Sequence, residues 1–270
     1  MTYKLGVIGF GNIARAIITP ILDNKLLQPN QVFCLVKSKS SFENLKKSYK
    51  YNINLFHKNS SDASLVWDCP IKLLSVKPQQ INEISEIYFP RNKTNTIVSI
   101  LAGVSLNKLE KKFPSHACVR TVTNIPITIS KGLTGISWGG GVDDDHRHFI
   151  LNIFKNSSKI YELNENYLDI FLALTSSSPA IVALIVEALS DGGLSGGLQK
   201  NLSEELVLEM MYGTILMLKN NQLTTSELKN LVTSPAGTTI SALRVLEKRS
   251  FRSALIESII AASNRSKEFR

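Results

Sequence analysis

The sequence has few cysteines, and their spacing excludes two kinds of small scaffold. Cys34, Cys69 and Cys118 are odd in number and form no C-x-x-C pair, so neither a disulfide framework nor a zinc site is expected. The 15 glycines and 9 prolines are close to average use, which excludes collagen-like and low-complexity chains. A reducing, cytoplasmic setting is the simplest interpretation of this composition.

Long uninterrupted apolar runs are also absent. The most apolar later stretch, Ala180–Leu189, is interrupted by Glu187 and is much shorter than the ~20 residues that a helix needs to cross a bilayer. The N-terminus begins an apolar strand pattern at once, without the basic segment of a signal peptide. We therefore expect a soluble protein with no membrane partner.

The charge is unevenly divided along the chain. Residues 1–160 carry 21 basic and 10 acidic side chains, whereas residues 161–270 carry 10 basic and 12 acidic ones. This step indicates a domain boundary and assigns any anionic partner to the first part. The basic residues are spread out and accompany no nucleic-acid-binding motif, so we expect a small anionic ligand and no nucleic acid.

The first part, residues 1–163, alternates short apolar runs with segments of helical spacing. This order predicts βαβ units and a doubly wound, mostly parallel sheet of the Rossmann type with right-handed crossovers. The expected strands are Lys4–Ile8, Val32–Val36, Ile71–Val76, Thr96–Leu101, Ala117–Val122 and Leu133–Trp138. The expected helices between them include Asn12–Asn24 and Ser40–Tyr49.

The second part, residues 164–270, lacks strand patterns and is expected to be all-helical. The segment around Ala180–Leu189 is apolar on every side, so its helix must be buried all round. Because about 105 residues cannot easily enclose such a helix, we expect a second copy of the domain to cover it. The other expected helices are Ser203–Lys219, Thr225–Val232, Thr239–Glu247 and Phe251–Lys267.

A glycine-rich turn follows the first expected strand and precedes the first expected helix. Its pattern, G-x-G-x-x-A, is typical of dinucleotide binding, because the first glycine permits a tight turn and the second lets the backbone approach a pyrophosphate. The helix N-terminus then offers N–H groups to the phosphates. A purely structural glycine turn is the alternative. The predicted cofactor-binding residues here are Gly9, Phe10, Gly11, Asn12 and Ile13.

The end of the second strand indicates which dinucleotide is bound. Sites that prefer NAD usually place an acid there, but this chain has none before Glu43 and instead carries Lys37, Ser38 and Lys39. Lysines and hydroxyls suit a 2′-phosphate, so NADPH is the predicted cofactor, with NADH as the second choice. In the alternative interpretation, the two lysines belong to a solvated loop.

Five motifs, taken in order, resemble the pyrroline-5-carboxylate reductases over essentially the whole chain. They also place further polar residues at strand ends and helix starts. The motifs are the glycine turn, Ser75-Val-Lys-Pro-Gln79, Ser99-Ile-Leu-Ala-Gly-Val104, Val119-Arg-x-x-x-Asn-x-Pro126, and Ser234-Pro-Ala-Gly-Thr-Thr-Ile240 with the tail Ala261–Glu268. The resemblance implies reduction of 1-pyrroline-5-carboxylate to proline with a nicotinamide cofactor, in a homodimer formed through the helical domain, with higher assembly left open.

The chain departs from the family pattern in three places. It lacks a proline and a threonine around Asn124, and it has Ser176 and Ser178 where the family has glycines, as well as Ile181 for a tyrosine. Ala236 replaces a further glycine. A glycine that needs positive φ would not tolerate serine or alanine without strain, so these positions bear on activity more than on fold.

The resemblance assigns the substrate to the Ser234–Thr239 turn. Its glycine opens a helix, and backbone N–H groups there suit a carboxylate. The family also implies that the Thr239 hydroxyl lies near the ring nitrogen, which makes it a predicted catalytic residue; helix capping alone is the alternative. The predicted substrate-binding residues are Ser234, Gly237, Thr238, Thr239 and Glu165, the last matching an acidic family position or simply starting a helix.

Further cofactor contacts are expected at later strand ends, the edge where open α/β sheets bind ligands. Lys77 is predicted to contact the cofactor and to assist catalysis, or else to be a surface cation. Small residues at the next strand end would let the nicotinamide approach, and a polar amide could bond the carboxamide or cap a turn. These predicted residues are Val76, Lys77, Pro78, Ala102, Gly103 and Asn124, following Lys37, Ser38 and Lys39.

Two other functions stay open at this point. A β-hydroxyacid dehydrogenase shares the outline, but the stretch 164–182 contains no lysine to serve as its catalytic residue. A regulatory protein that binds a cofactor is the non-enzymatic alternative, motivated by the three departures. The four histidines and the run Asp143–Asp145 show no metal-ligand spacing, so no metal site is predicted.

Overall fold

The computed structural model describes residues 3–84, 95–220 and 223–269. Two compact units divide the chain. The first comprises the chain up to Ser176 together with the segment from Ala262 on, and the second comprises Ser177–Ala261. The first unit therefore ends 13 residues after the predicted domain boundary at 163/164. The C-terminal segment also belongs to the first unit.

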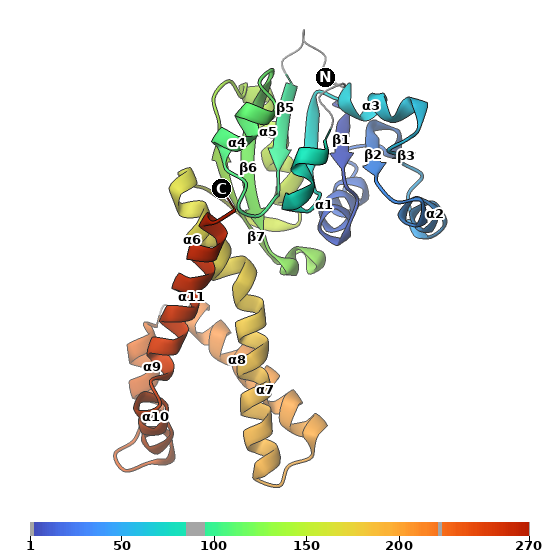
Figure 1. Ribbon diagram of the computed structural model, residues 1–270. Coiled ribbons are helices and arrows are strands. Elements are labelled where there is room, and N and C mark those ends of the chain that lie inside the picture. Colours follow the sequence, from blue (N-terminus) through green and yellow to red (C-terminus); the bar gives the residue numbers. More distant parts are fainter. Residues whose placement is uncertain (1–2, 85–94, 221–222, 270) are drawn as a thin grey trace. The chain divides into compact units, whose positions relative to one another are not determined.

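An eight-stranded sheet forms the centre of the first unit (Figure 1). Its order is β3-β2-β1-β4-β5-β6-β7-β8. The first six strands in this order are parallel and have the Rossmann arrangement, and β7 is antiparallel to β6 but parallel to β8. The strands are β1 (Leu5–Ile8), β2 (Val32–Val36), β3 (Asn54–His57), β4 (Ile71–Leu74), β5 (Asn95–Ser99), β6 (His116–Thr123), β7 (Gly132–Trp138) and β8 (Ser158–Glu162).

Helices cover both faces of this sheet. On one face, α1 (Asn12–Asp23) and α5 (Asp144–Lys155) bury residues such as Ile17 and Phe154 against β1, β4 and β6. On the other, α3 (Ser64–Trp67) and α4 (Leu106–Lys112) bury Trp67 and Leu109. Both faces are thus dry, as a parallel sheet requires. The helix α2 (Lys39–Ser48) follows β2 and contributes Leu45 to the first of these cores.

The six predicted strands and the Rossmann order are confirmed, and two edge strands were missed. The strands β3 and β8 carry polar residues such as Asn54 and Glu162, and all of β3 and most of β8 are only partly buried or exposed. Edge strands need only one neighbour and one apolar face, so they lack the continuous apolar run that marked the central strands.

The second unit is helical. Its helices α7, α8, α9 and α10 agree with the predicted ones to within a few residues, except that α7 is longer at both ends. They are α7 (Ser178–Ser195), α8 (Lys200–Asn220), α9 (Thr225–Leu231), α10 (Thr238–Lys248) and the first part of α11 (Phe251–Lys267). The helices α7 and α8 pack closely where Gly193 faces Ser203, whose Oγ donates to the Ser190 carbonyl at 2.7 Å.

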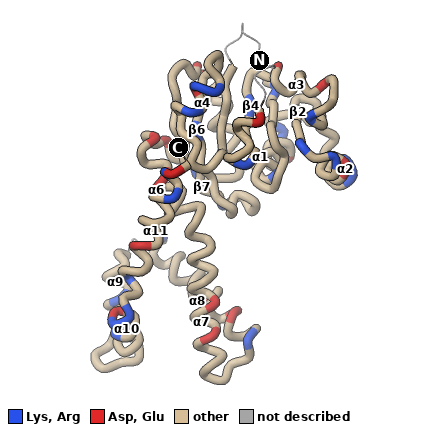
Figure 2. Tube along the Cα trace, viewed as in Figure 1, with Lys and Arg blue, Asp and Glu red and all other residues tan. Residues whose placement is uncertain are grey.

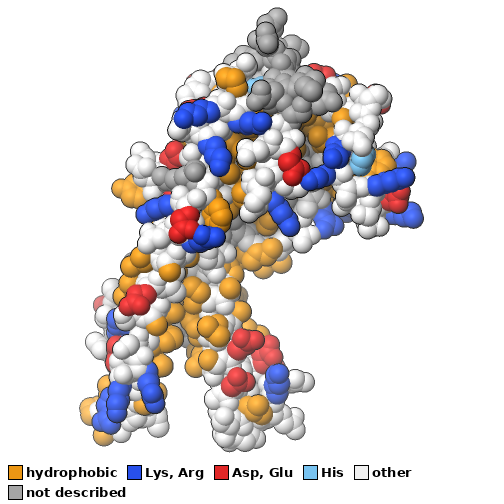
Figure 3. Space-filling view, viewed as in Figure 1, with side chains coloured by type: hydrophobic (Ala, Val, Ile, Leu, Met, Phe, Trp, Pro, Cys, Tyr) orange, Lys and Arg blue, Asp and Glu red, His pale blue; other side chains and the backbone are white. Residues whose placement is uncertain are grey.

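Much of the apolar surface of α7 and α8 lies in the open in the single chain. Leu184 is 64% exposed, Leu206 51% and Tyr212 63%. Figure 3 shows hydrophobic side chains gathered along the helices of this unit on the face in view. An exposed apolar surface of this extent is typical of sites of protein–protein contact.

The helical segment that includes α7 is longer than the sequence indicated. Glu165–Ser195 runs through α6 (Leu168–Leu172) and a π-helical turn, Ala173–Ser177, into α7. Its length, and an 18-residue window within it of mean hydropathy 1.8, would allow it to cross a membrane, by these two properties alone. The expectation that this region is too short to do so was therefore wrong, because the helix extends past Ala180–Leu189 at both ends.

Candidate functional site

The glycine turn after β1 has the geometry that a dinucleotide needs. Gly9 has φ +88°, and a Cβ on it would lie 2.5 Å from the Ser75 carbonyl oxygen, so only glycine fits. Gly11 is the N-cap of α1, and a Cβ on it would meet no atom within 4 Å. The backbone of Gly11 therefore faces open space at a helix N-terminus, where a pyrophosphate can approach.

A cavity of about 630 Å³ opens beside this turn, at the carboxyl ends of β1, β2 and β4. A cavity at this edge of an open α/β sheet is where nucleotide cofactors bind. The structure brings six of the predicted cofactor residues together in its lining, from three separate segments of the chain. They are Gly9, Phe10, Gly11, Lys37, Val76 and Lys77. The Phe10 ring itself is buried against Tyr49, so Phe10 offers its backbone.

Five polar lining residues were missed as site residues by sequence reasoning: Ser41, Lys58, Ser75, Gln80 and Glu83. Lys58 directly follows β3, which was itself missed, so no pattern placed it beside the end of β2. Glu83 ends the short 3-10 helix Pro78–Glu83 and lies 2.6 Å from the Lys37 ammonium. A prediction of β3 would have located Lys58, but nothing in the sequence pairs Lys37 with Glu83.

Other predicted cofactor residues lie beside the cavity in the chain without lining it: Asn12, Ile13, Ser38, Lys39 and Pro78. Ser38 is the N-cap of α2, where its hydroxyl accepts from the Ser41 N–H at 3.1 Å. The contact of these five residues with a cofactor stays a prediction.

The small residue Gly103 is needed for packing inside the first unit. It has φ +71°, and a Cβ on it would lie 2.5 Å from the Cβ of Phe269 and 2.8 Å from the Ser266 carbonyl oxygen. The neighbouring Ala102 is exposed. Gly103 therefore lets the C-terminal end of α11 lie against the β5 end, and its predicted contact with the nicotinamide stays a prediction.

Asn124 is buried and uses both ends of its amide within the protein. Its Nδ2 donates to the Thr175 carbonyl at 3.1 Å, and its Oδ1 accepts from the Leu133 N–H at 2.8 Å. The amide thus ties the end of β6 to the π-helical turn before α7. Asn124 is the N-cap of the 3-10 helix Ile125–Ile129, but its side chain makes no capping hydrogen bond there. Its predicted contact with the carboxamide stays a prediction.

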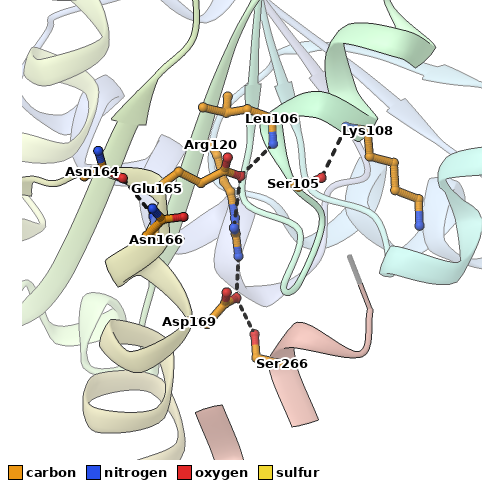
Figure 4. Close-up of polar contacts among 9 residues, drawn as sticks. All are labelled: Ser105, Leu106, Lys108, Arg120, Asn164, Glu165, Asn166, Asp169 and Ser266. Atoms are coloured by element: carbon orange, nitrogen blue, oxygen red, sulfur yellow. Dashed lines mark hydrogen bonds and ion pairs between the residues drawn. The ribbon is translucent and has the colours of Figure 1, made fainter. Parts of the chain in front are cut away.

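Arg120 on β6 is the centre of a buried polar network (Figure 4). Its side chain is fully buried and bonds Asp169 of α6 at 2.7 Å and Glu165 at 3.1 Å. Asp169 also accepts from the Ser266 hydroxyl of α11 at 2.9 Å. The network therefore joins two segments of the first unit around one arginine: the segment with α6, where the chain leaves the unit, and the end of α11, where it returns.

Glu165 takes part in this network through one carboxylate oxygen. Its Oε1 accepts from Arg120 and, at 2.7 Å, from the Leu106 N–H at the start of α4. The side chain is 25% exposed. Sequence reasoning placed Glu165 at a helix start but did not foresee Arg120, since residues 45 positions apart show no pattern. Its contact with a substrate stays a prediction.

In the second unit, the turn Ser234–Gly237 opens α10. Gly237 is the N-cap, and its N–H donates to the Ser234 carbonyl at 3.1 Å, so this predicted anion donor is already used. A Cβ on Gly237 would lie 2.4 Å from the Ser234 hydroxyl oxygen. Thr238 and Thr239 occupy the first turn of the helix, where N–H groups lack helical partners and favour an anion.

The three departures from the family pattern have different structural consequences. Ala236 has φ +57°, the left-handed conformation that favours glycine, so this substitution does strain the turn. Ser176 and Ser178 lie in helical turns and have no positive φ. The Ser176 hydroxyl instead donates to the Thr123 carbonyl at 2.9 Å, which a glycine could not do.

Other reactive groups in the described part of the chain are held in inert forms. Burial raises the pKa of the Cys69 and Cys118 thiols to about 12, so neither is a thiolate near neutrality. Burial, with the nearby Lys72 ammonium, lowers the pKa of His116 to about 4. Among residues 3–84, 95–220 and 223–269 no cluster of three metal-ligating side chains occurs. Figure 2 shows that the positions of lysine and arginine residues are spread over the first unit.

Comparisons with known proteins agree with this two-part description. Residues 4–103 match the family model "NADP oxidoreductase coenzyme F420-dependent", and residues 165–269 match "Pyrroline-5-carboxylate reductase dimerisation". The second match begins within two residues of the predicted boundary at 163/164.

Similarity to individual relatives extends along the full chain. Pyrroline-5-carboxylate reductases of Synechocystis sp. and Arabidopsis thaliana are 34% and 30% identical to it, and each alignment covers 99% of this chain and 98% or 95% of the relative. The solved Plasmodium falciparum pyrroline carboxylate reductase with NADP bound is 27% identical, with a TM-score of 0.83 over 99% of this chain and 98% of the other. A Coxiella burnetii pyrroline-5-carboxylate reductase gives 28% and 0.81, covering 100% of this chain and 99% of the other. The chain therefore belongs to the pyrroline-5-carboxylate reductase family.

Proposed function

We propose that this protein reduces 1-pyrroline-5-carboxylate to L-proline with NADPH, the last step of proline biosynthesis. The observation that carries the proposal is that similarity to curated reductases covers 99% of the chain, at 34% identity to the Synechocystis enzyme. The glycine turn of the first unit and the α10 turn of the second both lie within that similarity. The reaction class is an oxidoreductase acting on a carbon–nitrogen double bond.

The cavity of the first unit fits a dinucleotide phosphate. Gly9 makes the turn possible, Gly11 leaves open space at the N-terminus of α1, and Lys37 and Lys58 line the wall at the ends of β2 and β3. When bound, NADPH supplies the hydride. Lys77 lines the same cavity at the end of β4 and contributes a cation that attracts the anionic cofactor.

The first turn of α10 is assigned to the substrate carboxylate. The N–H groups of Thr238 and Thr239 and the positive end of the helix dipole favour an anion there. Ser234 and Gly237 shape this turn through their mutual hydrogen bond. Substrate binding then needs no lysine, which accords with the excess of acidic side chains in residues 161–270.

The chemical step adds a hydride to the imine carbon and leaves the ring nitrogen as a secondary amine. The nitrogen must therefore carry a proton when the hydride arrives. The Thr239 hydroxyl, at the start of α10, is assigned to hydrogen-bond this nitrogen as it becomes an amine and its lone pair forms. The Oε1 of Glu165 accepts hydrogen bonds from Arg120 and from the Leu106 N–H, so the other carboxylate oxygen is the one available for the substrate amine. Orientation and charge, rather than covalent catalysis, thus account for the rate.

The division of labour follows the predicted domains: residues 1–163 bind the cofactor, and residues 164–270 bind the substrate and a second copy. The exposed apolar side chains of α7 and α8, such as Leu184 and Leu206, support a homodimer. Residues 165–269, which include these two helices, match a dimerisation family, and this match gives the same assignment. We place the protein in the cytoplasm, where its three buried free cysteines stay reduced.

The role of Thr239 can be tested with purified protein. Thr239→Ala should lower kcat by about 10- to 100-fold, since one transition-state hydrogen bond is lost, while the Kd for NADPH stays unchanged. Thr214→Ala, the same change at an exposed hydroxyl of α8, is the matched control and should keep full activity. Equal rates for Thr239→Ala and Thr214→Ala would remove Thr239 from the mechanism.

A further inference from the structure

One ion pair crosses the wall of the cofactor cavity. The Lys37 Nζ lies 2.6 Å from the Glu83 Oε2, and the two side chains are 54% and 55% exposed. Both residues line the cavity that contains Gly9 and Gly11. The lysine assigned to the 2′-phosphate of NADPH is therefore paired with a carboxylate of the same cavity lining.

Glu83 also supplies a group that the end of β2 lacks. Rossmann sites that accept NADH place an acid at the end of the second strand, where it bonds the ribose hydroxyls. In this chain the strand end carries Lys37 instead, and Glu43 lies within α2 and does not line the cavity. Glu83 brings a carboxylate to the same place from a different element, the 3-10 helix after β4.

The pair is arranged so that a ligand can break it. An exposed ion pair in water contributes little to stability, so separating Lys37 from Glu83 costs little. A 2′-phosphate would attract Lys37 and repel Glu83, whereas a ribose with a free 2′-hydroxyl would donate to Glu83 and leave the pair intact. The same two side chains thus respond in opposite directions to the two cofactors.

We propose that Glu83 is the residue that sets the preference between NADPH and NADH. Its carboxylate competes with the 2′-phosphate for Lys37 and accepts a hydrogen bond from the ribose of NADH. Lys58, in the same cavity lining, has no ion-pair partner among the described residues and remains available to the phosphate. This inference rests on the proposed function only in taking the nicotinamide dinucleotides as ligands of the cavity.

The test measures binding rather than turnover. The Kd values of NADPH and NADH are determined by fluorescence titration at low ionic strength for the wild type, Glu83→Gln and Lys37→Met. Glu83→Gln should bind NADPH about 2- to 5-fold more tightly and NADH about 2- to 5-fold more weakly, the range expected for one exposed charge interaction. Lys37→Met should weaken NADPH binding and leave NADH binding nearly unchanged.

Glu43→Gln is the matched control, because it removes the same charge from an exposed position on α2 outside the cavity lining. It should leave the ratio of the two Kd values unchanged. The role of Glu83 would be overturned if the ratio of the NADPH and NADH Kd values were the same for Glu83→Gln as for Glu43→Gln. It would also be overturned if Glu83→Gln changed both Kd values in the same direction. Failure of the wild type to bind either dinucleotide would overturn this inference together with the proposed function, whereas binding with an unaltered ratio would overturn this inference alone.

Discussion

Lys72 offers a quantitative test of the packing of the first unit. It lies in the middle of β4, its side chain is fully buried, and its ammonium has no hydrogen-bond partner among the described residues. Burial lowers its pKa from 10.5 to about 8, although the nearby Cys69 and Asp68 act in the opposite direction. Burial in the native state therefore destabilises the protonated form of Lys72.

The free energy follows from this pKa. The decrease of the pKa from 10.5 to about 8 corresponds to a free energy of about 3 kcal/mol, by which the charged lysine destabilises the native state. Because the folded pKa of this base is below the unfolded one, the cost is fully present below pH 8 and disappears as the pH rises toward 10.5. Lys72→Met should remove it, and so raise the free energy of unfolding by up to about 3 kcal/mol at neutral pH.

Urea unfolding followed by tryptophan fluorescence measures this effect, since both tryptophans, Trp67 and Trp138, lie in the first unit. The difference between Lys72→Met and the wild type should be largest at pH 7 and should shrink between pH 8 and 10.5. Lys131→Met, at an exposed position, should show no such trend. A Lys72→Met protein that is less stable at pH 7, or an advantage independent of pH, would refute the reasoning.

Two further predictions concern stability. Arg120→Met should lower the free energy of unfolding of the first unit by about 3 to 5 kcal/mol, because Asp169 would be left buried with its main cation removed; an unchanged urea midpoint would contradict the network. Ala236→Gly should raise the thermal midpoint of the second unit by relieving φ +57°, with a gain of about 0.5 to 1 kcal/mol, whereas Ala254→Gly inside α11 should lower it, as calorimetry can show.

The sequence was most informative where one element carries its own signal. The central strands are buried on both faces, so β1 reads as a continuous apolar run and β4 as an apolar run interrupted only by Lys72. The glycine turn is specific because Gly9 must adopt a positive φ. The edge strands β3 and β8 were missed because their stability comes from a single neighbour. Without β3, the position of Lys58 in the cavity could not be predicted.

Interactions between distant parts of the chain were beyond sequence reasoning. Arg120 pairs with residues 45 and 49 positions later, and Asp169 bonds Ser266, which is 97 positions away. These contacts place the C-terminal end in the first unit, which the composition step at residue 160 could not indicate. Sequence reasoning interpreted Gly103 as space for a ligand and did not foresee that a Cβ there would also meet Phe269; the contact with a ligand stays a prediction.

The most direct test of the central claim is the reaction itself. Purified protein mixed with 1-pyrroline-5-carboxylate and NADPH should consume the reduced nicotinamide, followed by its absorbance, and should form one proline for each NADPH oxidised. Omitting the substrate should stop the consumption. If NADPH binds but no proline appears with either NADPH or NADH, the chain is a cofactor-binding protein without reductase activity, and the proposed function is wrong.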